Sequence, residues 1–124
     1  MGNYFKTKDI ELDVVISSPS KRTKETLDHF FSNNFSKIEY VKSLYHAHLE
    51  DILEVVTGSS EDTRTIMIVG HNPSMHEVTE FLSGDFLPKY PTCSLASLLY
   101  EGEWQDLKAN SCELDFFKMP RELR

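Results

Sequence analysis

Two short apolar segments of the chain each lead into a proline that can open a helix. The first is residues 12–18, LDVVISS, followed directly by Pro19, and the second is residues 65–70, TIMIVG, which reaches Pro73 through two polar residues. Runs of β-branched apolar residues of this length are typical of buried parallel strands. Proline suits the first turn of a helix. The chain is therefore predicted to pass twice from a buried strand straight into a helix, which restricts it to a few folds.

The remaining pattern continues this alternation. We expect further strands at residues 38–41, 95–100 and 114–119. We expect a helical turn at residues 1–5 and helices at about 19–31, 49–56 and 74–82. Strands that alternate with helices predict an α/β domain with a mainly parallel sheet flanked by helices. The last two strands are close enough in sequence to pair antiparallel at an edge.

Several residues are predicted to mark where these helices begin and end. Ser18 is expected to cap the helix at residues 19–31, and the polar residues 32–34 to end it. Gly58 and Gly84 each follow an apolar pattern with helical spacing, where a helix C-terminal glycine belongs.

Length and charge limit the class of protein. The 124 residues are enough for one domain and one core. The formal charge of −7 argues against a nucleic-acid partner, which needs clustered lysine and arginine. The two cysteines form no disulfide framework, and no apolar run approaches the roughly 20 residues of a membrane span. The N-terminus also lacks the apolar core of a signal peptide. We expect a cytoplasmic protein with no membrane partner.

The residues that follow the first two strands carry the chemistry. If the two strands are neighbours in a parallel sheet, Arg22 and His71 are expected to face the same crevice. Arginine presents planar paired donors suited to phosphate, and histidine can move protons near neutral pH. The helix dipole disfavours cations at a helix N-terminus, so the position of Arg22 in a first helical turn indicates a role other than helix stability. The plainer alternatives are a solvated helical turn for Lys21 and Arg22, and a capping or core role for His71.

Other histidines allow two further roles. His46 and His48 form a His-x-His pair, and His76 follows His71 closely. These four side chains could in principle ligate a metal, although no carboxylate is placed as an obvious bridging ligand. His46 alone could instead lie at the mouth of the crevice as a proton donor or a substrate contact.

Together these motifs resemble a known family. The pattern SSPxxRxxxT at residues 17–26 followed by GHNP at residues 70–73 resembles the histidine phosphatase superfamily. Within it, the small SixA-like phosphohistidine phosphatases fit best. Residues 44–47, LYHA, are similar to the connection that those proteins carry between the two motifs. The resemblance covers roughly residues 1–119.

The resemblance implies a phosphoglycerate mutase-like fold and a phosphatase that acts on phosphohistidine or a small phosphoester. In that family a histidine of an N-terminal Arg-His-Gly motif accepts the phosphoryl group and passes it to water. Arg22 matches the second arginine of the phosphate pocket, and His71 matches its second histidine. Asn72 and His46 are expected to contact the substrate beside them. The partner would be a phosphate-bearing small molecule or phosphoprotein, and no metal or other cofactor is implied.

One departure from the family is large. The sequence contains no Arg-His-Gly and no expected strand before residue 12, and residues 1–5 resemble the end of the family's first helix. We therefore expect residues 1–124 to form a single histidine-phosphatase-like domain without its first strand and most of its first helix. Such a chain should bind phosphate without turnover and should self-associate through exposed sheet edges. The alternatives are a non-catalytic module that binds phosphate or phosphoproteins and, less favoured, a metal-dependent hydrolase.

Overall fold

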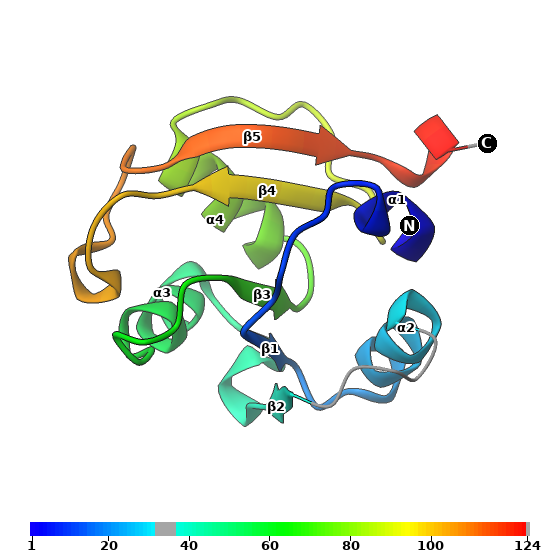
Figure 1. Ribbon diagram of the computed structural model, residues 1–124, viewed down its shortest axis with the longest axis horizontal. Helices are drawn as coiled ribbons and strands as arrows, with labels where there is room; N and C mark the ends of the chain where they lie inside the picture. Colours follow the sequence, from blue (N-terminus) through cyan, green and yellow to red (C-terminus); the bar gives the residue numbers. More distant parts are fainter. Residues whose placement is uncertain (32–36, 124) are drawn as a thin grey trace.

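A three-stranded parallel sheet forms the centre of the chain. The computed structural model describes residues 1–31 and 37–123. Strand β1 (Val14–Ser17) lies between β2 (Ile38–Tyr40) and β3 (Ile66–Val69), and both neighbours run parallel to it (Figure 1). The three β-branched segments therefore form strands as predicted, and the first and third are neighbours.

The helices follow the strands in the predicted order. They are α1 (Gly2–Lys6), α2 (Lys21–Phe31), α3 (Leu49–Thr57) and α4 (Ser74–Ser83). In Figure 1, α1 and α2 lie on one side of the three-stranded sheet and α3 lies on the other. None of the helices in the described residues is both long and apolar enough to cross a membrane.

The last two strands pair antiparallel, as predicted. Strand β4 (Leu95–Leu99) pairs with β5 (Glu113–Lys118), with a register shift between Ser97 and Leu98. Within the described residues they form a two-stranded sheet of their own and do not pair with the parallel sheet. Helix α4 contacts both of these strands and also packs against α3 (Figure 1). The separate antiparallel pair is therefore joined to the rest of the molecule through helix packing.

The main core lies between the parallel sheet and the helix pair α3–α4. Its buried members are apolar side chains from β1, the turn after β2, α3 and α4: Ile16, Leu44, Ile52, Val78 and Leu82. Because side chains alternate along a strand, Val15 lies on the opposite face of β1 from Ile16. Val15 and the α2 residue Leu27 are both almost completely buried.

Helix α2 begins later than the sequence predicted. Its first residue is Lys21, and the Ser20 hydroxyl accepts the backbone N–H of Thr23 at 3.2 Å. The expected cap, Ser18, is buried at the end of β1, where its hydroxyl has other partners. The predicted end of this helix at residues 32–34 lies outside the described residues. Gly58 and Gly84 directly follow α3 and α4, as predicted.

Candidate active site

The carboxyl ends of β1 and β3 lie next to each other. Ser17 is in register with Val69, and the backbone N–H of Ser18 donates to the carbonyl of Val69 at 2.9 Å. Two residues further along, the His71 ring reaches back across this junction, and its Nε2 lies 2.9 Å from the Ser18 Oγ. The two motifs that the sequence singled out therefore meet at one edge of the sheet.

Ser18 joins these motifs to helix α2. Its hydroxyl also accepts the backbone N–H of Ser20 at 3.3 Å. Its carbonyl accepts the hydroxyl of Thr23 at 2.7 Å. Ser18 is completely buried, so these hydrogen bonds hold a polar group that would otherwise be costly to bury. The start of α2 is thereby fastened to the same junction as His71.

Arg22 lies in the first turn of α2 and is exposed to solvent. Within the described residues its guanidinium forms no hydrogen bond or ion pair, and the backbone N–H groups of Lys21 and Arg22 have no partner either. Free N–H groups and a guanidinium at one helix N-terminus favour an anion. The pairing of Arg22 with His71 around a phosphate stays a prediction.

The segment after His71 is fixed by hydrogen bonds to the following loop. The Asn72 amide donates to the carbonyl of Tyr90 at 2.6 Å, and the Ser74 hydroxyl donates to the carbonyl of His71 at 2.8 Å. Burial raises the pKa of the Tyr90 hydroxyl above its usual value. Asn72 therefore has a structural partner in residues 85–94, and its expected contact with substrate stays a prediction.

A small hollow of about 260 Å³ opens beside His71. We call it the histidine hollow, and its lining residues are His46, Ala47, His48, His71, Asn72, Pro73, Ser74 and Glu77. The Tyr45 ring stands at 82° to the His71 ring, with 5.9 Å between their centroids, and Tyr45 also contacts His46. His46 and His71 thus line the same hollow, and the expected role of His46 at the mouth of the crevice stays a prediction.

The four histidines proposed as alternative metal ligands do not form a metal cluster. His76 Nε2 lies 2.6 Å from the carbonyl of Leu87, and the His76 ring stacks on Tyr90. In residues 1–31 and 37–123, no group of three or more histidine, cysteine, aspartate or glutamate side chains could hold a metal ion. The metal-dependent alternative is therefore wrong in its ligand set, because His76 packs against the loop that follows α4.

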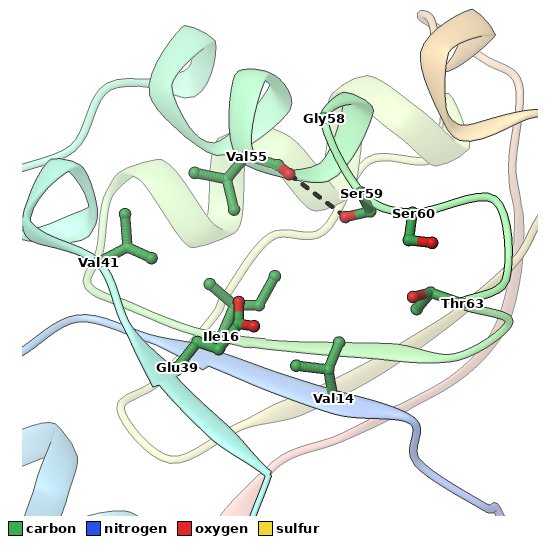
Figure 2. A pocket seen from close by; sticks show the side chains of 9 residues that line it. All are labelled: Val14, Ile16, Glu39, Val41, Val55, Gly58, Ser59, Ser60 and Thr63. Carbon is green, nitrogen blue, oxygen red and sulfur yellow. Dashed lines mark hydrogen bonds between the residues drawn. The ribbon is translucent and has the colours of Figure 1, made fainter.

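A second hollow, of about 280 Å³, lies between the parallel sheet and the end of α3 (Figure 2). Its lining residues are Val14, Ile16, Glu39, Val41, Val55, Gly58, Ser59, Ser60 and Thr63. None of them is a histidine, arginine or cysteine, and the Ser59 hydroxyl already donates to the carbonyl of Val55. Although this hollow is slightly larger, the groups suited to phosphate chemistry lie at His71.

Sequence reasoning missed three contributors to the site. Ser18 was predicted to cap a helix, Tyr45 to lie in a connection, and residue 77 only to lie in the helix at residues 74–82. Each lies within a few residues of a recognised motif, but nothing in the local pattern shows which way its side chain turns. Their roles depend on contacts between segments far apart in the chain.

Comparison with known proteins gives relatives along nearly the full chain. No family model matches it. The uncharacterized protein ML1117 of Mycobacterium leprae is 30% identical over 129 residues, which cover 97% of this chain and 79% of that protein. The uncharacterized protein Rv1276c of Mycobacterium tuberculosis is 25% identical over 130 residues, covering 97% of this chain and 81% of that protein.

Solved structures share the fold. A candidate phosphohistidine phosphatase SixA from Nakamurella multipartitia matches with a TM-score of 0.87 and 25% identity, over 96% of this chain and 77% of that one. The protein histidine phosphatase SixA complexed with tungstate matches with a TM-score of 0.82 and 19% identity, over 99% of this chain and 78% of that one. The sequence relatives, the shared fold and the two motifs agree, and the chain belongs to the SixA-like branch of the histidine phosphatase superfamily.

Proposed function

We propose that this chain forms the phosphate-binding part of a phosphatase-type hydrolase that acts on phosphohistidine or a small phosphoester. The observation that carries the proposal is that Ser18 fastens the His71 ring to the start of α2, the helix whose first turn carries the exposed Arg22. The named activity of the SixA structures supports the same choice of substrate.

In this proposal residues 1–124 act as a single domain, and each site residue has a separate task. Arg22 binds two phosphate oxygens and neutralises their charge. His71, held by Ser18, donates or accepts a proton at the phosphate. Asn72 and His46 contact the rest of the substrate.

We further propose that this chain alone does not turn substrate over. Family members transfer the phosphoryl group through a histidine of Arg-His-Gly, and residues 1–124 contain no such motif. A phosphatase assay combined with trapping of a phosphoenzyme tests this directly. We expect neither turnover nor a phosphoenzyme. Robust turnover that is abolished by His71→Ala would show that the nucleophile is present after all.

Binding of orthophosphate to the full chain tests the phosphate site itself. We expect weak saturable binding by isothermal titration calorimetry, and Arg22→Ala should weaken it at least about tenfold, since hydrogen bonds to charged groups contribute about 1.5–3 kcal/mol. Arg64→Ala is the matched control, because Arg64 is also exposed and lies before the start of β3, at the opposite end of the strands. Equal loss in both variants would reject a specific site at Arg22.

A non-catalytic module that binds phosphorylated partners is the alternative, favoured by a phosphate site without the nucleophile motif. The coding sequence upstream of Met1 separates the two. An in-frame segment with Arg-His-Gly favours the enzyme, and a stop codon close upstream favours the binding module.

We also propose that the chain resides in the cytoplasm and associates with itself through its sheet edges. Two thiols without a bridge suit a reducing compartment. Within the described residues β3 pairs only with β1, and β4 pairs only with β5. Strand edges without a partner are templates for pairing with another chain.

A further inference from the structure

The second hollow, between the parallel sheet and the end of α3, has an apolar floor that the phosphate site does not use (Figure 2). We call it the sheet–helix hollow. Val14 and Ile16 of β1 form its sheet side, and Val55 of α3 lies across from them. At about 280 Å³ the hollow is smaller than the roughly 300–1,000 Å³ of sites for drug-sized ligands. It is therefore sized for a small molecule or group with an apolar part.

One carboxylate lies at the wall of this hollow. Glu39 of β2 is in register with Ile16, so both side chains leave the sheet on the same face. In Figure 2 the Glu39 side chain rises beside Ile16 into the hollow. Within the described residues its carboxylate forms no hydrogen bond or ion pair. A carboxylate in this place attracts a cation and repels an anion.

The end of α3 is a second source of negative charge. Gly58, the residue that directly follows this helix, lines the hollow. A helix C-terminus carries a partial negative charge, because its last carbonyls have no partner within the helix. No basic residue lies in the last turn of α3 to compensate this charge. The helix end and Glu39 therefore favour the same kind of ligand, a cation, from the two sides of the hollow.

Two hydroxyl groups in the wall can accept hydrogen bonds from such a cation. The Ser59 hydroxyl donates its proton to the carbonyl of Val55 at 3.3 Å, which leaves its oxygen able to accept. The Thr63 hydroxyl has no hydrogen-bond partner within the described residues. An ammonium group offers three N–H donors and no acceptor, which suits a wall of carboxylate and hydroxyl oxygens. A metal ion suits it less, because no three histidine, cysteine, aspartate or glutamate side chains of residues 1–31 and 37–123 form a metal cluster.

We propose that the sheet–helix hollow binds an aliphatic ammonium group on a short stem. The stem lies on the valine and isoleucine floor, and the charged end lies between Glu39 and the end of α3. Glu39 is the residue that selects the charge. The histidine hollow contains His48, at the opposite end of α3. The ammonium site is therefore separate from the proposed phosphate site and does not depend on it.

Two probes of equal length and opposite charge test the selection of a cation. They are butylammonium and butanoate, both ionised at pH 7 like the side chains of lysine and glutamate. Amide chemical shifts of the full chain, followed by NMR, should show saturable binding of butylammonium at Val41, Val55 and Thr63, and much weaker binding of butanoate. Equal binding of both probes, or no saturable shift at these residues, would overturn the proposal.

Substitution of Glu39 tests which group provides the charge. Glu39→Gln should weaken butylammonium binding about three- to fivefold, as expected for an exposed ion pair, and Glu39→Lys should abolish it. Glu113→Gln is the matched control, because Glu113 is also an exposed glutamate on a strand but does not line the hollow. Unchanged binding in Glu39→Lys with an unchanged thermal transition, or equal weakening in both glutamine variants, would overturn the proposal.

The length of the stem tests the apolar floor. Ethylammonium carries the same charge but lacks two methylene groups, so it should bind about tenfold more weakly than butylammonium. Equal binding of the two ammonium ions would show that the apolar floor does not contribute, and the proposal would fail.

A third probe distinguishes a free amine from a lysine side chain of a partner protein. Nα-acetyl-lysine methylamide carries the same butylammonium group on a peptide backbone. Binding weaker than that of butylammonium indicates a free amine, and tighter binding indicates a lysine side chain; both results support the ammonium site.

Orthophosphate titrations in the same samples keep this site apart from the proposed function. Arg22→Ala should weaken orthophosphate binding and leave butylammonium binding unchanged. If orthophosphate fails to bind while butylammonium binds through Glu39, the proposed function fails and the ammonium site stands. Loss of butylammonium binding in Arg22→Ala, with an unchanged thermal transition, would place the cation elsewhere and overturn the proposal.

Discussion

The buried Ser18 hydroxyl holds the two motifs of the site together. It bonds to the His71 ring and to the backbone N–H of Ser20. Ser18→Ala removes both bonds and leaves two partly buried groups unsatisfied, so we expect the free energy of unfolding to fall by about 1–3 kcal/mol. Urea denaturation measures this change. Ser60→Ala is the control and should change little, because Ser60 is exposed; an equal loss in both variants would contradict the role of Ser18.

The two thiols should differ in reactivity. Cys93 is exposed, whereas Cys112 is partly buried, and burial raises the pKa of the Cys112 thiol. Because the thiolate is the reactive form, Cys112 should react much more slowly than Cys93 with a thiol reagent in the native protein. Mass spectrometry after brief labelling measures the two sites separately. Both should label at similar rates in urea, and equal rates in the native state would contradict the burial of Cys112.

At the scale of elements, the two glycines that end helices differ in how much their position requires glycine. Gly84 has φ of 77°, and an added Cβ would also lie against the Asn110 side chain. Gly58 has φ of −83°, and an added Cβ would lie 3.3 Å from the nearest atom, the Glu54 carbonyl oxygen. Gly84→Ala should therefore destabilise by about 1–2 kcal/mol or more, and Gly58→Ala by less than about 0.5 kcal/mol. Thermal unfolding of the two variants measures this difference, and equal transition temperatures would contradict it.

Asp13 ties the beginnings of β1 and β3 together. Its carboxylate accepts the backbone N–H groups of Arg64 at 2.8 Å and Thr65 at 3.0 Å. These bonds favour the ionised form and hold the pKa of Asp13 below its usual value of 3.8. Asp13 therefore contributes its full stabilisation of the fold above about pH 4, where its carboxylate is ionised even in the unfolded chain. This stabilisation is lost as the pH falls through the lower pKa that Asp13 has in the folded chain.

Replacement of this carboxylate tests the link. We expect Asp13→Asn to unfold at lower temperature than the wild type near pH 7, with the difference closing as the pH falls below about 4. Differential scanning calorimetry across pH measures both curves. A constant difference at every pH would show that the charge of Asp13 does not matter.

At the scale of the whole molecule, the separated sheets leave strand edges that can pair between chains. Light scattering after size exclusion should show association that grows with concentration. Leu99→Lys, which places a charge on β4, should reduce it, whereas Phe86→Lys should not, because Phe86 is exposed in a loop rather than on a strand. A monodisperse monomer with a sharp unfolding transition at high temperature would contradict this picture.

Much of the fold was predictable from local pattern alone. The apolar runs before Pro19 and Pro73 form adjacent parallel strands, and glycines end the helices at residues 58 and 84. These features follow from the period of apolar residues and from the backbone preferences of proline and glycine, which act over a few residues. The family motifs are also continuous in sequence, so Arg22 and His71 could be selected without a structure.

Tertiary structure alone decided how those residues are used. Ser18 was predicted to cap a helix, but its hydroxyl forms a hydrogen bond with the His71 ring, and α2 begins at Lys21. His76 packed on Tyr90, which removed it from any histidine cluster. The Ser18–His71 hydrogen bond and the His76–Tyr90 ring contact each join residues more than ten positions apart. A polar side chain can have several possible hydrogen-bond partners along the chain. Leaving a buried polar group unpaired costs the most free energy, and only the folded structure determines which groups are buried.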